Sequence, residues 1–407
     1  DDTLNYYTRI IEPQDCYVKE SIDFAKDFHE KTFQKDGSGS LATYMEPDSS
    51  ADNTTLANVS IHSTLRQVTW DKFNGTVLTD PSVSIKEINN SYNVILLDYV
   101  VTATGDNGEL EYYNVEEYYR VRYTSSRMYL LNFERRMNQI FRGENASFFD
   151  NYIELGIRSG NVEYQANETG TTVAFVQEGE LWSYNETENT LAKVFSFRGY
   201  EGIDNRENYG EHDIKIVRID EAGSLDYIVY GYMNRGNHEG EVGAAVYYYR
   251  AERNVATEEI FVPADISYEM LKKQLDRLSY VNKQREMYLY LNENLCKVDI
   301  ETGTTTVVRE SIPEDCFVVS ESQESIAWMD ADNASSAMNI TVMNLESGET
   351  QRFAADDGQK IRALGFINED FVYGMANDSD ILKDISGNEV FAMHTAVSYT
   401  HLTLPTI

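Results

Sequence analysis

The chain has 407 residues, of which 42% are hydrophobic, and its 68 acidic and 34 basic side chains give a net charge of −34. The hydrophobic content is enough for a sizeable core and excludes a disordered chain, while the length predicts two or three domains. The acidic excess excludes nucleic acid and anionic membrane surfaces as partners, because both would be repelled. Solubility is the simplest explanation of this charge, and cation binding is the alternative.

An amphipathic helix is predicted from residue 15 to residue 33, with Asp15 as its N-cap. One helical face is marked by residues that recur at the required spacing, namely Val18, Ile22, Ala25 and His29. His29 lies on this buried stripe. A single histidine in that position is more often a packed core residue than a ligand, so we interpret it as core.

The helix is followed by a polar segment and then by a series of strands. Residues 36–55 contain GSGS and PDSSAD and are predicted to form a flexible loop or linker. Strand-like segments occupy residues 58–70, 92–104, 109–123 and 127–133, and the turn Gly105-Asp106-Asn107-Gly108 joins two of them as a hairpin. A helix followed by an antiparallel meander is an α+β layer. We therefore place an α+β domain at residues 1–150, cystatin-like or NTF2-like in outline by analogy of shape alone.

A strand pattern then returns from about residue 171 to the end of the chain. It consists of an apolar strand, a tight turn, a strand ending in Asp or Asn, a second turn and a Thr/Val strand. The clearest copies are residues 286–309 and 339–353, and residues 172–197 form a degenerate copy. Repetition on this scale predicts a β-propeller or another repeat array.

The repeats divide into units of up to four strands. The strands are expected at 172–176, 180–184 and 191–197; at 213–219, 225–232, 243–250 and 256–262; at 278–281, 285–291, 294–300 and 304–309; at 316–320, 325–330, 339–345 and 349–354; and at 361–367 and 370–375. A short helix is predicted at residues 267–277, with Ser267 as N-cap. The even spacing predicts an incomplete β-propeller of about five blades over residues 162–395. A stacked pair of β-sandwiches is the rival fold.

Two turn sequences carry a resemblance to a known family. Asp299-Ile300-Glu301-Thr302-Gly303 and Asn344-Leu345-Glu346-Ser347-Gly348-Glu349 each end the third strand of a unit, where an acceptor side chain closes the turn and Gly supplies a positive φ. On these residues the stretch 162–395 resembles the WD40-like and TolB-like β-propellers of bacterial envelope proteins. The resemblance implies an extracytoplasmic propeller. The Gly-His and Trp-Asp signatures of WD40 repeats are absent, so no WD40 partner role follows.

Two long loops between predicted strands are the candidate ligand- or partner-binding site. Residues 199–212 and 233–242 are rich in Gly and polar residues, and long loops within compact domains are more often functional than decorative. The candidate residues are Asp204, Arg206, Glu207, His212, Arg235, His238, Glu239 and Glu241. A His–carboxylate pair is suited to a divalent metal, and the two arginines are suited to a carboxylate. The alternative is a solvated loop whose charges pair with each other.

A weaker metal hypothesis concerns four aspartates, Asp330, Asp332, Asp356 and Asp357, which are expected on the same face. Their oxygens suit Ca²⁺, but they lack the spacing and terminal Glu of an EF-hand. No other cofactor is expected. Nucleophile, zinc-protease, P-loop and dinucleotide motifs are absent from the sequence.

Cysteine and Asn usage bear on the compartment. The three cysteines, Cys16, Cys296 and Cys316, are too few for a disulfide framework, although a single Cys296–Cys316 bridge is conceivable. Ten Asn-x-Ser/Thr sequons would carry glycans in a eukaryotic secreted protein and would be incidental in a bacterial one. Sparse Cys with abundant Tyr and Asn is typical of surface-exposed bacterial proteins. We expect an extracytoplasmic protein, either secreted or in the cell envelope.

The last eleven residues, 397–407, read VSYTHLTLPTI and resemble a translated sequencing adapter. We therefore expect a non-native tail that takes no part in the fold. The chain begins at Asp1 rather than Met, so a membrane anchor preceding it is expected to be the only membrane contact.

These observations favour a non-enzymatic binding or interaction module. We expect a monomer that binds a protein, glycan or small molecule, either as an envelope lipoprotein or as an anchored accessory of a signalling system. The alternatives are a glycan- or peptide-acting hydrolase or lyase that uses Glu207, Glu239 and Glu241, and a purely structural surface domain.

Overall fold

A computed structural model describes residues 16–34, 38–105, 108–144, 147–149, 152–156, 162–199, 204–383, 385, 387 and 389–400. The chain forms two compact units: unit 1 comprises Asp1–Gly210 with Asn234–Gly240, and unit 2 comprises Glu211–Met233 with Glu241–Ile407. Strands dominate both units, which confirms the prediction of a mainly β protein.

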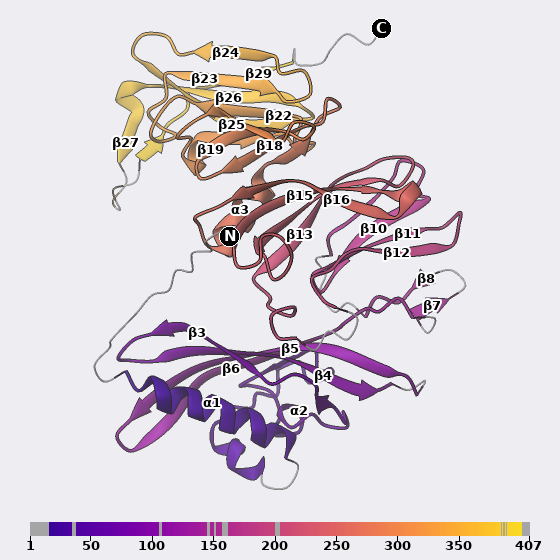
Figure 1. Ribbon diagram of the computed structural model, residues 1–407. Helices are drawn as coiled ribbons and strands as arrows, with labels where there is room; N and C mark the ends of the chain where they lie inside the picture. The colour runs from indigo at the N-terminus through magenta and orange to yellow at the C-terminus, as the bar shows by residue number, and fades with distance from the viewer. Residues whose placement is uncertain are drawn as a thin grey trace, which may run out of the picture. The chain divides into compact units, whose positions relative to one another are not determined.

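Unit 1 contains the predicted α+β layer, in which helix α1 (Val18–Phe33) covers one face of an antiparallel sheet (Figure 1). The strand order is β1-β6-β5-β4-β2, and β3 also pairs with β4. The strands are β1 Asn58–Ser60, β2 Thr76–Val77, β3 Ser82–Ile88, β4 Asn93–Thr104, β5 Leu110–Thr124 and β6 Arg127–Gln139. The predicted hairpin joins β4 to β5, with Thr104 opposite Leu110, although Asp106 and Asn107 lie outside the described residues.

Helix α1 buries the predicted stripe only in part. Ala25 and His29 are buried, whereas Val18 and Ile22 are half-buried, and Phe28 fills the core beside them. The interpretation of His29 as a packed core residue is therefore confirmed. The N-cap position is Tyr17, in the left-handed region at φ 48°, and the expected cap Asp15 lies outside the described residues.

The sequence prediction was wrong for most of residues 58–70. The strand ends at Ser60, and helix α2 (Leu65–Val68) follows, with Thr64 at its N-cap position. The Thr64 hydroxyl donates to Gln67 Oε1 at 2.6 Å, so local polar contacts favour a helical turn over a strand. The preceding segment, predicted as a flexible linker, contains the 3-10 helix η1 (Ser38–Thr43), and Leu41 anchors it in the core.

Unit 1 also contains a four-stranded antiparallel sheet. Its order is β12-β11-β10-β9, with β9 Tyr164–Ala166, β10 Thr172–Gln177, β11 Glu180–Asn185 and β12 Thr190–Phe195. A small hairpin, β7 (Phe148–Phe149) and β8 (Tyr152–Ile153), precedes it. The three strands predicted from the degenerate repeat are confirmed.

Unit 2 contains three consecutive four-stranded antiparallel sheets, each with its strands in chain order. Their strands are β13 His212–Ile219, β14 Leu225–Tyr232, β15 Val242–Arg250 and β16 Val255–Pro263; β17 Ser279–Val281, β18 Glu286–Leu291, β19 Asn294–Asp299 and β20 Thr304–Arg309; and β21 Phe317–Val319, β22 Ser325–Met329, β23 Asn339–Asn344 and β24 Thr350–Ala354. This up-and-down arrangement is that of propeller blades, which confirms the predicted fold class. Helix α3 (Tyr268–Arg277) follows the first blade, and Ser267 caps it by accepting from the Met270 N–H at 3.3 Å.

The two turns that carried the family resemblance close as expected. The Asp299 carboxylate accepts from the Thr302 N–H at 2.9 Å, and the Asn344 side chain accepts from the Ser347 N–H at 2.8 Å. Gly303 and Gly348 follow with φ of 66° and 75°. The same side-chain closure therefore ends the third strand in both blades.

The last sheet of the described chain has three strands in the order β25-β26-β29. They are β25 Gln359–Ile367, β26 Asp370–Asn377 and β29 Thr395–Tyr399. Between β26 and β29 the chain forms a hairpin of β27 (Ile381–Lys383) and β28 (Glu389–Phe391). The expected non-native tail contributes to β29 from Val397 to Tyr399, so this part does join the fold. Its alternating residues fit a strand, and the Tyr399 ring lies 5.0 Å from that of Phe353. Residues 401–407 lie outside the described part of the chain.

The conceivable Cys296–Cys316 bridge is not formed, because all three cysteines are buried free thiols. No helix within the described ranges has the length and apolar character needed to cross a lipid bilayer.

The buried carboxylate of Asp226 in β14 ties two blades of unit 2 together. It accepts from Arg218 at 2.7 Å and from Arg285, in the turn before β18, at 2.6 Å. We predict that Asp226→Ala lowers the free energy of unfolding by about 3 kcal/mol, because two arginines lose their shared partner. Urea denaturation measures this, with the exposed Glu252→Ala as the control. A loss equal to that of the control would contradict the prediction.

Candidate functional site

The long strand β5 places alternate side chains on opposite faces of the sheet. Val115, Glu117 and Tyr119 point to the side covered by α1 and are buried, whereas Asn114 and Glu116 lie on the other face. The two faces differ in chemistry, because one encloses a charged network and the other borders a cleft.

The enclosed face holds a carboxylate with no exposed surface. Glu117 accepts from the Tyr99 hydroxyl at 2.8 Å and from the Tyr119 hydroxyl at 2.7 Å, and its Oε2 lies 3.1 Å from His29 Nδ1. Burial opposes ionisation, but the hydrogen bond and charge of His29, with the charge of Arg135, hold the pKa of Glu117 below its usual value. Burial and the nearby Glu117 raise the pKa of both tyrosines well above 10.

Arg135 of β6 is the buried cation of the same network. Its guanidinium donates to the carbonyl oxygens of Val68 at 2.9 Å and Gln67 at 2.7 Å and lies 3.5 Å from the centre of the Trp70 ring. Burial lowers its pKa. The network joins α1, α2 and three strands and lies away from solvent, so it positions the sheet rather than reacting with a ligand.

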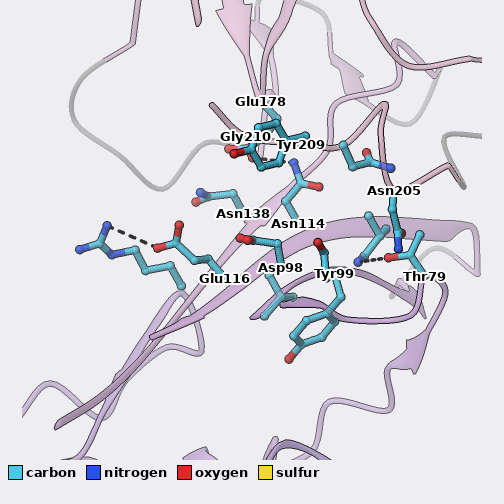
Figure 2. Close-up of a pocket in the computed structure, with 15 residues that line it drawn as sticks. Thr79, Asp98, Tyr99, Asn114, Glu116, Asn138, Glu178, Asn205, Tyr209 and Gly210 are labelled. Carbon is cyan, nitrogen blue, oxygen red and sulfur yellow. Dashed lines mark hydrogen bonds and ion pairs between the residues drawn. The ribbon is translucent and has the colours of Figure 1, made fainter. Parts of the chain in front are cut away.

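The opposite face of the sheet forms the floor of a cleft of about 260 Å³, which we call the polar cleft (Figure 2). Its floor is set by strand register: Asp98, Glu116 and Arg136 lie side by side across β4, β5 and β6, and Asn114 lies opposite Asn138 in the next row. Ser82 of β3 extends the first row, opposite Asp98, and the lining also includes Thr79, Glu178, Asn205, Asn208, Tyr209 and Gly210.

Two hydrogen bonds within unit 1 join segments that line or border the cleft. Asn114 Nδ2 donates to Glu178 at 2.8 Å, and Glu178 sits in the β10–β11 turn with φ 49°. Asn205 Nδ2 donates to the Asp80 carbonyl oxygen at 3.2 Å. Figure 2 shows Asp98, Asn114 and Asn138 directed into the cleft from the sheet, opposite Tyr209.

Five of the eight predicted loop residues meet in one ion-pair cluster. Arg206 lies 3.1 Å from Asp204 and 2.9 Å from Glu239, and Arg235 pairs with Asp204 and lies 3.3 Å from Glu207. Hydrogen bonds from Arg206 hold the pKa of Asp204 below its usual value. The loop charges therefore pair with each other, the arrangement that the sequence analysis set beside ligand binding.

The other three predicted residues, His212, His238 and Glu241, lie at separate positions along the chain. His212 begins β13 opposite Gly231, His238 lies in the turn after Gly236, and the Glu241 carbonyl oxygen accepts from the Met233 N–H at 2.9 Å. Residues 200–203 of the first loop lie outside the described residues.

The first predicted loop also contributes residues to the polar cleft that were not among the eight candidates. Asn205, Asn208 and Tyr209 line the polar cleft, whereas the charged residues between them fix the loop. Sequence reasoning also missed the sheet residues. Their signal was the pair of polar residues Asn114 and Glu116, and the pair Arg136 and Asn138, each with an apolar residue between them.

The structure gives the calcium hypothesis no cluster. Asp330 lies 3.2 Å from Arg309 and 3.5 Å from Arg352. Across the described ranges, no group of three or more His, Cys, Asp or Glu side chains is arranged to hold a metal ion. Asp332, Asp356 and Asp357 therefore do not belong to such a group.

We predict that Glu117→Gln lowers the free energy of unfolding at pH 7 by about 3 kcal/mol, because it leaves Arg135 without its buried counter-charge. The pKa of Glu117 is lowered on folding. Its stabilisation is therefore present above the unfolded value of about 4.3 and is lost as the pH falls through the lower folded value. Urea denaturation at pH 7 and pH 3 measures both effects, with the exposed Glu30→Gln as the control. If Glu117→Gln lowered the free energy of unfolding equally at the two pH values, the stabilising role assigned to the ionised Glu117 would be contradicted.

We predict that Arg235→Ala loosens the loop that borders the cleft, because Asp204 and Glu207 both lose a cation. Amide exchange at Glu207 and Tyr209 should become about tenfold faster, since their N–H groups are bonded within this loop. Hydrogen exchange with mass spectrometry measures this, and Arg253→Ala, on the surface turn η3 (Ala251–Arg253), is the control. Unchanged exchange at both amides would show that the ion pairs do not hold the loop.

No family model matches the sequence, and no curated protein matches it. Solved structures that are similar in part include the tricorn protease, at 14% identity over 76% of this chain and 30% of that one, with a TM-score of 0.30. Others are a Bacteroides thetaiotaomicron protein of unknown function, at 9% identity over 73% and 81% (TM-score 0.26), and the Pyrococcus horikoshii acylaminoacyl peptidase, at 10% over 72% and 42% (TM-score 0.30). This chain thus spans about a third of the tricorn protease, and its fold class rests on the strand pairings described above.

Proposed function

We propose that the protein is a binding module that acts outside the cytoplasm and takes a small polar ligand in the polar cleft. The observation that carries the proposal is the row Asp98, Glu116 and Arg136 on the cleft floor. Its two carboxylates lie directly opposite each other on paired strands. Like charges in that arrangement destabilise a sheet. A ligand that contacts both carboxylates would offset the cost of keeping them together on the floor of the cleft.

The loop residues support binding rather than catalysis. Glu207, Glu239 and Glu241 were considered for acid and base catalysis, and two of them, Glu207 and Glu239, are each engaged by an arginine. A carboxylate engaged by a guanidinium is occupied by that contact and is poorly placed to exchange a proton with a substrate. The hydrolase alternative therefore moves to the floor pair, Asp98 and Glu116, where two carboxylates do lie in one cleft.

The proposed location outside the cytoplasm is supported by the blade turns at Asp299 and Asn344, which resemble those of envelope propellers. The net charge of −34 supports a soluble partner rather than nucleic acid or a membrane surface.

We predict that a library of small saccharides, peptides and amines contains members that raise the melting temperature by about 5 °C at a hundred times their Kd. Differential scanning fluorimetry measures the shift. The double variant Asn114→Leu/Asn138→Leu should lose it, because both amides face the cleft, whereas Asn132→Leu on the same face of β6 should keep it.

Two results would change the assignment. A shift that survives the double variant would place the ligand elsewhere and contradict the proposal. Turnover of a stabilising compound, abolished by Glu116→Gln, would assign the hydrolase alternative to this cleft.

A further inference from the structure

We infer that the ligand of the polar cleft is an uncharged saccharide, an inference that rests on the proposed binding function and specifies its ligand.

The charges of the cleft disfavour an anionic ligand. Among the described residues that line it, three are carboxylates, Asp98, Glu116 and Glu178, and one is a cation, Arg136. That cation is already shared, because it lies 4.0 Å from Glu116 and 3.6 Å from Glu134 outside the cleft. A phosphate, sulfate or uronic acid would therefore meet net negative charge without an arginine to receive it.

The groups that remain available suit hydroxyls. The side chains of Asn138 and Ser82 face the cleft and form no hydrogen bond with the described part of the chain, and Asn114 keeps its carbonyl oxygen beside them. An amide and a hydroxyl each both donate and accept, as a sugar hydroxyl does. Carboxylate acceptors beside an amide donor can hold two neighbouring hydroxyls of one ring.

The floor disfavours a peptide that binds as an added strand. Strand addition needs an open sheet edge with free main-chain groups. Here the floor is the centre of the sheet, and β5 is paired along its length with β4 on one side and β6 on the other. Only side chains are offered to the ligand, which is the way that a saccharide without a main chain must be recognised.

The size of the cleft suits a ligand of about one ring. Its volume of about 260 Å³ lies just below the range of roughly 300–1,000 Å³ that is usual for small-molecule sites. Tyr209 lies opposite the amides of the floor and can cover the apolar face of a ring that hydrogen-bonds to them.

The test is an immobilised panel of neutral hexoses, N-acetylhexosamines, amino sugars, uronic acids, sulfated sugars and short peptides, probed with the whole chain. We expect binding to neutral sugars and not to their uronic acid or sulfated counterparts. Calorimetric titration with the strongest neutral sugar then measures the variants. Asn138→Ala should weaken binding about tenfold, because a sugar hydroxyl loses its partner.

Two further variants keep the test decisive. Ser82→Trp should abolish binding by filling the cleft, while Asn132→Ala on the same sheet face should leave affinity unchanged, and circular dichroism checks that each variant folds. Binding of anionic sugars, or of peptides alone with loss in Asn138→Ala, would overturn the saccharide inference and leave the binding function standing. Binding to no member of the panel, or binding unaffected by Asn138→Ala and Ser82→Trp, would overturn both.

Discussion

The carboxylate of Glu117 sits at the centre of unit 1 with no exposed surface, and the arrangement of the sheet around it depends on how that charge is satisfied. Tyr99, Tyr119 and His29 each contact it, and Arg135 supplies a buried positive charge nearby. Burying an unpaired carboxylate costs several kcal/mol, so few alternative packings are tolerated. This constraint fixes α1 against β4 and β5 and fixes the register of β5 between its neighbours.

The same register creates the polar cleft. A strand exposes alternate residues on each face, so a slip by one residue would move Glu117 out of the core and carry Asn114 and Glu116 into it. The buried network makes that slip costly. It thereby holds Glu116 beside Asp98 and Arg136, and Asn114 beside Asn138, on the face where the cleft lies. The buried network on one side of the sheet and the proposed binding site on the other are thus two consequences of one alternating pattern.

The sequence predicted features that depend on neighbouring residues and missed those that depend on distant ones. The turns at Asp299 and Asn344, the cap at Ser267 and nearly all of the blade strands follow from local patterns, and the structure confirms them. The bond between His29 and Glu117 joins residues 88 positions apart, and no local pattern announces it. The strand predicted over residues 58–70 failed because the side chain of Thr64 favours a helical turn.

The loop at residues 204–210 shows the same limit for the site. Its length and composition predicted a binding site, and the charged residues were chosen as candidates because charged side chains commonly bind ligands. In the folded chain Arg206 and Arg235 are engaged by their own acidic neighbours, and the uncharged Asn205 and Tyr209 reach the cleft. Which charges satisfy each other is set by tertiary structure, and composition alone cannot separate a pairing residue from a binding one.

A crystal structure of the whole chain, grown with a mixture of neutral hexoses and N-acetylhexosamines, would show whether a sugar occupies the polar cleft. The account predicts a sugar ring on the outer face of β5 and β6, with its hydroxyls bonded to the Asn138 amide and its face against Tyr209. A ring bound at the Arg206 and Arg235 loop, or a cleft in which Asn138 bonds instead to its own chain, would contradict it.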